Sequence, residues 1–311
     1  MADLPAERTS PAPPFTAIGM DVFGHWWISN GQSTRRTCSR RKCWALLFTC
    51  LASRAVHVEC LPALDATTFI NAFKRFLALR GPCNSVRSDR GSNFIGARNQ
   101  ASEVNLKQVT RTLTDLGVTW NMNPPHASHF GGVWERKMGQ VRRALDAAIL
   151  ATGNRTLSYD ELNTFLQEAA AIVNARPLWD APYEPTEAVP ITPNMLLTQK
   201  YGNVEQHPEL TEKDALAYGP RRWRRVQLMA NYFWTLWRKN YLLDLQTRNK
   251  WTTSARELVV GDIVLIKEKN ASRSSWPVGI VGETHPSHDG VVRSATVRLS
   301  QRELSERARR W

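Results

Sequence analysis

The first part of the chain consists of short apolar runs whose β-branched and aromatic residues predict strands. Three such runs cover residues 15–27, 44–51 and 55–60, and we expect them to lie side by side as antiparallel strands. Asp21 is the only carboxylate in the first run. Because an unpaired buried carboxylate is costly, Asp21 must reach water, a cation or a hydrogen-bond network.

Apolar residues then recur at helical spacing. Asp65 is in position to cap this helix and Gly81-Pro82 ends it. Its stripe is expected in the core and consists of Phe69, Phe73, Phe76 and Leu77. A second helix over about residues 93–114 and a short strand over residues 118–120 follow. The order β-β-β-α-β-α-β predicts a mixed α/β sheet flanked by helices.

Between these two helices, a short β-prone run places Asp89 at the tip of a strand. Gly91 allows a sharp turn two residues later, before polar residues that can begin a helix. Ligands gather at strand tips in open α/β sheets, because the ladder holds the side chain while the loop leaves it open. The alternative is a turn aspartate that is satisfied by its own backbone, the commoner role of an isolated Ser-Asp-x-Gly.

A loop rich in Pro and Gly leads into a further helix that carries Glu135. The apolar stripe of this helix consists of Trp134, Met138, Val141 and Leu145. Glu135 lies off that stripe, on a face shared with Gly139 and Arg142, four and seven residues later. The bare backbone at Gly139 would let a phosphate chain come close. The alternative is a solvated charged face.

The second half of the chain predicts a helical layer and a small β domain. Ser158 and Glu161 fit a capping box for the next helix. A long helix is expected over residues 221–246, with an apolar stripe that packs and basic residues that are available to DNA. Three β runs suit a small barrel that binds nucleic acid or protein tails. They cover residues 258–266, 276–281 and 291–299.

The chain is strongly basic. Lys and Arg total 41 against 28 Asp and Glu, which gives a net charge of +13 and a pI near 9.9. No apolar run is long enough to cross a bilayer, so the charge favours nucleic acid over a membrane as partner. The sequence starts without the apolar segment of a signal peptide, which favours a reducing compartment.

The five cysteines follow neither a disulfide nor a zinc pattern. They include no C-x-x-C pair, and no H-x-x-x-H follows them, so we interpret them as ordinary, mostly buried thiols. They are Cys38, Cys43, Cys50, Cys60 and Cys83. His57 has no neighbouring set of ligands and is interpreted as structural.

Several phrases of this sequence resemble the integrase core of retroelements, and in wording they are most similar to the BEL/Pao class of LTR retrotransposons. These phrases are F-T-A-I-G-M-D at 15–21, S-D-R-G-S-N-F at 88–94 and P-P-H-A-S-H-F-G-G-V-W-E-R at 124–136. The phrase N-A-R-P-L at 174–178 also resembles the close of integrase cores. The resemblance implies a ribonuclease-H-like mixed sheet, followed by a linking helix and a small SH3-like β-barrel.

The resemblance assigns the catalytic and metal-binding triad to Asp21, Asp89 and Glu135. Three carboxylates hold hard divalent cations, and two Mg²⁺ (or Mn²⁺) ions are implied, with no zinc in this chain. In the implied mechanism, water trims the 3′ end of the element and the new 3′-hydroxyl attacks target DNA. The candidate DNA contacts flank the three acids and are Arg90, Asn93, Arg136, Arg142 and Arg143.

The implied protein is a DDE-type polynucleotidyl transferase that binds element ends and target duplex. It is expected to form a homo-oligomer and to reach the nucleus by way of the cytoplasm, without a membrane or small-molecule partner. Two features depart from retroviral relatives: 45 residues separate Asp89 from Glu135, and the amino-terminal zinc-binding His/Cys module has no counterpart. The alternatives are an inactive or host-adopted DNA- or chromatin-binding protein, and a ribonuclease H that acts on hybrids.

These inferences divide the chain into six expected segments. They are a flexible lead (1–14), an integrase catalytic core (15–178), a linker (179–220), a basic amphipathic helix (221–250), an SH3-like β-barrel (251–300) and a polar tail (301–311).

Overall fold

The computed structural model describes most, but not all, of the chain. The described residues are 6–9, 11–29, 40–88, 100–122, 132–151, 156–178, 190–200, 222–245, 256–268, 271–299 and 309–310. They form two compact units. The first unit comprises Met1–Asn174 with His207–Asn240, and the second comprises Ala175–Gln206 with Tyr241–Trp311.

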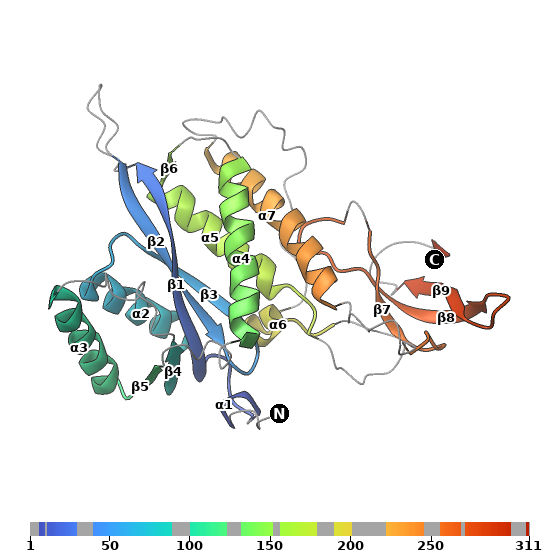
Figure 1. Ribbon diagram of the computed structural model, residues 1–311, viewed down its shortest axis with the longest axis horizontal. Helices are drawn as coiled ribbons and strands as arrows, with labels where there is room; N and C mark the ends of the chain where they lie inside the picture. The colour runs from blue at the N-terminus through green and yellow to red at the C-terminus, as the bar shows by residue number, and fades with distance from the viewer. Residues whose placement is uncertain are drawn as a thin grey trace. The chain divides into compact units, whose positions relative to one another are not determined.

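A mixed sheet is the centre of the first unit (Figure 1). Its main strands are β1 (Ala17–Ser29), β2 (Arg40–Cys50), β3 (Val56–Leu61), β4 (Ser85–Ser88) and β5 (Thr119–Met122), in the order β3-β2-β1-β4-β5. The first three strands pair antiparallel, whereas β4 is parallel to β1 and β5 is parallel to β4. The short β6 (Leu157–Ser158) pairs with the far end of β1. This topology confirms the predicted ribonuclease-H-like fold.

Two helices of this unit, α2 and α5, begin at caps that the sequence predicts. The described helices of this unit are α1 (Ala6–Thr9), α2 (Ala66–Arg80), α3 (Gln100–Asp115), α4 (Gly132–Ala151), α5 (Tyr159–Asn174) and α7 (Arg222–Leu245), of which the unit includes the part up to Asn240. Asp65 Oδ1 accepts a hydrogen bond from the Thr68 amide at 2.8 Å, which confirms the predicted N-cap. The Ser158 amide donates to Glu161 Oε2 at 2.8 Å and the Glu161 amide donates to Ser158 Oγ at 3.2 Å. This reciprocal pair confirms the capping box.

Aromatic rings join α2 to the sheet. Phe76 stacks on Phe48 of β2 with ring centroids 4.2 Å apart, and it meets Phe15 edge-on at 5.5 Å. All three rings are fully buried. Phe69 and Phe73 are buried as well, so the aromatic stripe of α2 forms core, as predicted.

The outer edge of β3 is covered by α5. The Asn174 side chain accepts a hydrogen bond from the Val56 amide and donates one to the Val56 carbonyl, each at 2.8 Å, and Gln167 donates to the Val58 carbonyl at 2.7 Å. These bonds satisfy backbone groups that an edge strand leaves open to pairing. Asn174, the first residue of N-A-R-P-L, therefore holds α5 against the outer edge of β3.

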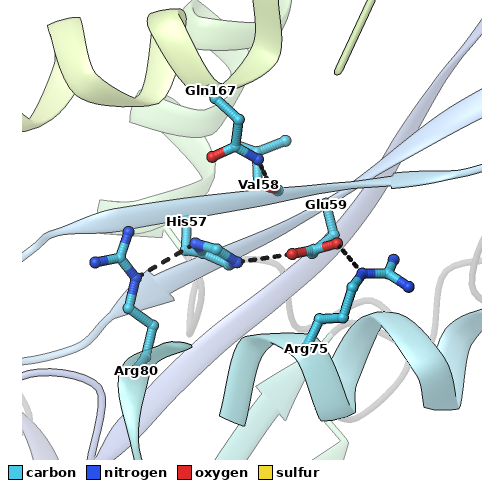
Figure 2. Close-up of polar contacts among 6 residues, drawn as sticks. All are labelled: His57, Val58, Glu59, Arg75, Arg80 and Gln167. Atoms are coloured by element: carbon cyan, nitrogen blue, oxygen red, sulfur yellow. Dashed lines mark hydrogen bonds and ion pairs between the residues drawn. The ribbon is translucent and has the colours of Figure 1, made fainter. Parts of the chain in front are cut away.

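A charged network lies between β3 and α2 (Figure 2). His57 Nε2 lies 3.1 Å from Glu59 Oε1, and Arg75 Nε donates to Glu59 Oε2 at 2.7 Å. Arg80 Nε contacts the other nitrogen of His57 at 3.3 Å. His57 is almost fully buried, and these contacts agree with the structural role predicted for it.

The network makes stability depend on pH. Burial by itself raises the pKa of Glu59, but the hydrogen bonds from His57 and Arg75 outweigh it and hold the pKa below its usual range. A carboxyl whose pKa is lower in the folded protein than in the unfolded chain stabilises the folded state. This stabilisation is complete above the unfolded-state pKa of about 4.3, and it is lost as the pH falls through the folded-state pKa. Glu59→Gln should therefore flatten the fall in the free energy of unfolding below about pH 4.3.

Urea denaturation at a series of pH values measures this effect. Glu283→Gln, at an exposed position of the second unit, is the control and should keep the wild-type profile. An unchanged acid slope in Glu59→Gln would show that the network does not couple protonation to folding.

The second unit contains a small antiparallel sheet. Its strands are β7 (Ile263–Leu265), β8 (Val278–Pro286), β9 (Val292–Leu299) and β10 (Arg309–Arg310), and the short helix α6 (Pro193–Thr198) belongs to the same unit. The sheet has its own apolar core of Ile266, Val281, Ala295 and Val297. A Cβ at Gly279 would lie 2.8 Å from the Arg298 carbonyl oxygen, so only glycine fits there. The sheet is consistent with an SH3-like domain.

The structure differs from the sequence-based expectation in several places. Residues 6–9 of the predicted flexible lead form α1, and Glu7 accepts a hydrogen bond from Arg87 Nε at 2.8 Å. Helix α6 lies inside the segment interpreted as a linker, where Thr192 caps it and Pro193 occupies its first turn. Strand β2 begins at Arg40 instead of Trp44, and β10 adds a strand in the segment expected to be a polar tail.

Candidate active site on strand β1

Asp21 lies in the middle of β1, on the face of the sheet that α4 covers. Its neighbours Met20 and Val22 point to the opposite face and are buried, because successive side chains of a strand alternate. The Asp21 side chain itself is 33% exposed. A carboxylate placed in this way remains accessible to a ligand although its strand is central in the sheet.

Arg142 of α4 contacts this carboxylate directly. Its Nη2 atom lies 2.7 Å from Asp21 Oδ2, and its guanidinium carbon lies 5.2 Å from the centroid of the Phe23 ring. Phe23 follows Asp21 by two residues and so shares its face of β1. The guanidinium is thus held by an anion and by an aromatic face, which are the two partners that arginine prefers.

A second polar bond fixes α4 on β1. Trp26 Nε1 donates to Asp146 Oδ1 at 2.9 Å, and the Trp26 ring meets the Phe23 ring edge-on at 5.6 Å. Asp146 lies one helical turn beyond Arg142, so both bonds come from the same face of α4. Together they set the rotation and the position of α4 along β1.

The parallel pairing of β1 and β4 defines the neighbouring strand tip. Met20 is in register with Ser88, and these two residues immediately precede Asp21 and Asp89 in the sequence. Ser88 is buried, and its hydroxyl oxygen accepts a hydrogen bond from Trp120 Nε1 at 2.9 Å. The end of β4 is therefore held firmly. Asp89 itself lies outside the described residues.

The other predicted site residues are described to different degrees. Glu135 and Arg136 belong to α4, but their side chains lie outside the described part of the structure, as do Arg90 and Asn93 as whole residues. Arg143 is exposed. Of the predicted triad and its flanking contacts, the structure brings together Asp21 and Arg142, and it describes no position for the remaining carboxylates.

The space around position 139 does not require a glycine. A Cβ built there would lie 3.8 Å from Arg143 Nη1, an ordinary van der Waals distance. The predicted approach of a phosphate chain over Gly139 stays a prediction.

Among the side chains that the structure describes, no group of three or more His, Cys, Asp or Glu residues is arranged to hold a metal ion. Cys43, Cys50, Cys60 and Cys83 are buried free thiols, as predicted, and Cys38 lies outside the described residues. Burial raises the pKa of Cys83 to about 12. This thiol is therefore not a nucleophile at neutral pH.

Sequence reasoning missed the residues that position Asp21. Arg142 was expected to contact DNA, and its bond to Asp21 spans 121 positions of the chain. Trp26, Asp146 and Trp120 carried no sequence signal, because a tryptophan in a strand and an aspartate in a helix are common in packed cores and on helix surfaces. These residues meet their partners only because α4 docks on β1 and β5 pairs with β4.

Two family models match the sequence. Residues 12–128 match the integrase core domain, and residues 221–310 match a family of unknown function, DUF5641. This part of the chain is thus similar to an integrase core domain. The first match includes Asp21 and Asp89 but ends before Glu135. A comparison with curated proteins gave no match, and none of the described helices has the length and apolar character needed to cross a membrane.

Solved integrases resemble the chain weakly. The catalytic core of HTLV-2 integrase, in complex with magnesium, is 18% identical with a TM-score of 0.35, and the match covers 54% of this chain and 90% of that chain. The catalytic core of BIV integrase is 16% identical with a TM-score of 0.38, covering 60% and 95%. A simian T-cell lymphotropic virus intasome, in complex with PP2A regulatory subunit B56 gamma, is 13% identical with a TM-score of 0.41, covering 96% and 80%. With TM-scores below 0.5, these likenesses by themselves establish no function.

Proposed function

We propose that this protein is a retroelement integrase of the BEL/Pao class, which catalyses metal-dependent 3′-end processing and DNA strand transfer. The observation that carries the proposal is the parallel register of Met20 and Ser88, the residues immediately before Asp21 and Asp89. Two aspartates that follow paired positions of neighbouring strands are a suitable start for a shared cation site. The match of residues 12–128 to the integrase core domain supports the same function.

The described carboxylate fits a hard divalent cation. Asp21 offers oxygen ligands, remains one-third exposed and already accepts a hydrogen bond from a cationic group, Arg142. In the proposal, Asp21, Asp89 and Glu135 hold Mg²⁺ or Mn²⁺. When bound, these ions neutralise the charge that develops at phosphorus during displacement and lower the pKa of the attacking hydroxyl.

Helix α4 carries both Glu135 and Arg142, and their spacing supports a role for Glu135 near Asp21. Arg142 lies seven residues beyond Glu135, about 10.5 Å along the axis at roughly 1.5 Å per residue. Helical side chains lean toward the helix N-terminus, so an Arg142 that reaches Asp21 extends toward the turn that carries Glu135. This geometry supports Glu135 as the third carboxylate.

Arg142 has a second role in the proposal. DNA brings phosphates that compete with Asp21 for the guanidinium, and charge-assisted bonds to phosphate are strong. We expect Arg142 to exchange Asp21 for a phosphate when DNA enters, which leaves the carboxylate to its cation. Arg143, exposed on the same helix, supplies a further phosphate contact. The partners in this proposal are element ends and target DNA, bound by a homo-oligomer in the nucleus.

A strand-transfer assay tests the proposal. Oligonucleotides that carry the element's ends are incubated with the chain, target plasmid and Mg²⁺ or Mn²⁺, and joined products are resolved on a gel. Glu135→Gln removes one negative charge at nearly constant size, so it should lose strand transfer while it retains DNA binding. Equal transfer by wild type and Glu135→Gln would exclude Glu135 as the third ligand.

The alternative is a DNA-binding protein without catalysis, and the Arg142 bond to Asp21 is the observation that favours it. An aspartate that pairs with an arginine is also expected in a helix–sheet contact that has only a structural role. If neither metal supports transfer, yet duplex binding weakens with a log–log salt slope of about −0.9 per neutralised phosphate, this alternative is preferred.

A further inference from the structure

The far half of the β1–β2 hairpin has an unusual charge. Residues 24–45 contain no Asp or Glu but five Lys or Arg. The hairpin extends past β3, β4 and β5 (Figure 1), since residues 26–29 of β1 pair with residues 40–43 of β2 where those strands have ended. A segment of this kind favours a polyanion.

One face of this hairpin combines basic and aromatic side chains. The register places Trp27 opposite Lys42 and Ser29 opposite Arg40, and a register shift between Gly24 and Trp26 inserts His25. We call the resulting surface the hairpin face; it consists of His25, Trp27, Arg40, Lys42 and Trp44. All of these side chains except the partly buried Trp44 are exposed, and Trp27 is 51% exposed.

The side chains of the hairpin face contact one another. Lys42 Nζ lies 5.6 Å from the centroid of the Trp27 ring, and the His25 ring lies 5.7 Å from both the Trp27 and the Trp44 rings. Cross-strand contacts of this kind stabilise a hairpin. In addition to this role, the Trp27 ring leaves about half of its surface open to a ligand.

The hairpin face is separate from the candidate active site. Asp21 lies on the face of β1 that α4 covers, as does Trp26, which bonds to Asp146. Trp27 points to the opposite face and lies six residues beyond Asp21, roughly 20 Å along a strand that rises about 3.3 Å per residue. A molecule on the hairpin face therefore needs no contact with Asp21.

We infer that the hairpin face binds an unpaired DNA strand, with a base stacked on Trp27 and phosphates contacted by Lys42 and Arg40. An exposed ring beside cations is the arrangement by which proteins hold single strands without sequence preference. In duplex DNA the base faces are buried in the stack, so only the phosphates of a duplex can contact the hairpin face. The choice of DNA over RNA rests on the proposed function; the choice of an unpaired strand does not.

Fluorescence anisotropy with the full chain tests this inference. The probes are a labelled single-stranded 12-mer of DNA, its duplex and the matching RNA. Trp27→Ala should weaken binding of the single DNA strand roughly 5- to 150-fold, the effect of losing one stacked base. Duplex affinity should change less than about twofold. Lys42→Gln should weaken both DNA probes and lower the salt slope by about one phosphate.

Trp223→Ala is the matched control. Trp223 on α7 is 45% exposed and has the Arg224 guanidinium 5.6 Å from its ring, so it shares the exposure and the neighbouring cation of Trp27. Its loss should leave single-strand affinity unchanged. An equal loss with Trp223→Ala would show that any exposed tryptophan has this effect and would overturn the inference, as would binding of the RNA at least tenfold tighter than the DNA.

A second measurement covers the case in which Trp27→Ala fails to fold. Wild-type chain is photo-crosslinked to a single strand that contains 5-iododeoxyuridine, and the modified peptide is identified by mass spectrometry. We expect the crosslink in the peptide that contains Trp27; its absence there overturns the inference. Strand-transfer activity does not enter either measurement, so a chain without activity can still confirm the hairpin face, and an active chain can still refute it.

Discussion

Asp21→Asn should reduce strand transfer by roughly 10³-fold or more. Metal ligation contributes several kcal/mol to stabilising the transition state, and each 1.4 kcal/mol corresponds to about a factor of ten. The amide that replaces the carboxylate keeps its size but loses the charge that holds a divalent cation. The rate of product formation at saturating Mn²⁺, compared with wild type on the same oligonucleotides, measures the effect.

The same variant should keep its affinity for duplex DNA or improve it. Arg142, which donates to Asp21 at 2.7 Å in the structure, loses a competing anion and becomes more available to phosphate. Asp115→Asn, an equal change in charge at the exposed end of α3, is the control and should retain wild-type transfer. If Asp21→Asn transfers strands within tenfold of wild type, Asp21 is not a metal ligand and the proposed active site is wrong.

Arg225→Met should lower the free energy of unfolding by about 3–5 kcal/mol, the cost of leaving one charge of a buried ion pair without its partner. Arg225 Nη2 of α7 lies 3.0 Å from Glu161 Oε1 of α5, and both side chains are buried. Glu161 also belongs to the capping box at the start of α5. The change therefore affects the contact of α7 with α5 and the helix start together. Urea denaturation followed by circular dichroism measures it.

An exposed ion pair provides the comparison. Arg293 Nη1 donates to Asp289 Oδ1 at 2.8 Å in the second unit, with both side chains at least half exposed. Arg293→Met should cost far less stability than Arg225→Met, because water screens such pairs. The double variant Glu161→Gln, Arg225→Met should recover part of the loss, since no buried charge is then left alone. A loss below about 1 kcal/mol in Arg225→Met alone would mean that water reaches Glu161.

Helix α7 shows which features a sequence pattern can predict and which it cannot. Its apolar stripe and its length were predictable from helical periodicity, and the structure gives Arg222–Leu245 against an expected 221–246. The expectation that its basic residues are available to DNA is wrong for Arg225 and Arg238, which are buried. Periodicity identifies the apolar face, but it cannot tell which cation at the border of that face has a buried partner such as Glu161.

The candidate site shows the same division. The sequence alone indicated Asp21, as the single carboxylate of an apolar strand, and Asp89, as a carboxylate before a glycine turn, because local composition and turn chemistry are encoded in neighbouring residues. It also predicted the individual strands and helices of the first unit and the caps at Asp65 and Ser158. Each of these depends on residues within a few positions of one another.

The partners of these residues were decided by the tertiary structure. The bond from Arg142 to Asp21 and the bond from Trp26 to Asp146 each join residues about 120 positions apart, and the hairpin face depends on a register shift beside His25. Such pairs follow from how α4 docks and how β1 and β2 align, which are set by the summed packing of the whole core and not by any local pattern. The sequence thus indicated Asp21 as a candidate site residue, and the tertiary structure determined that Arg142 contacts it.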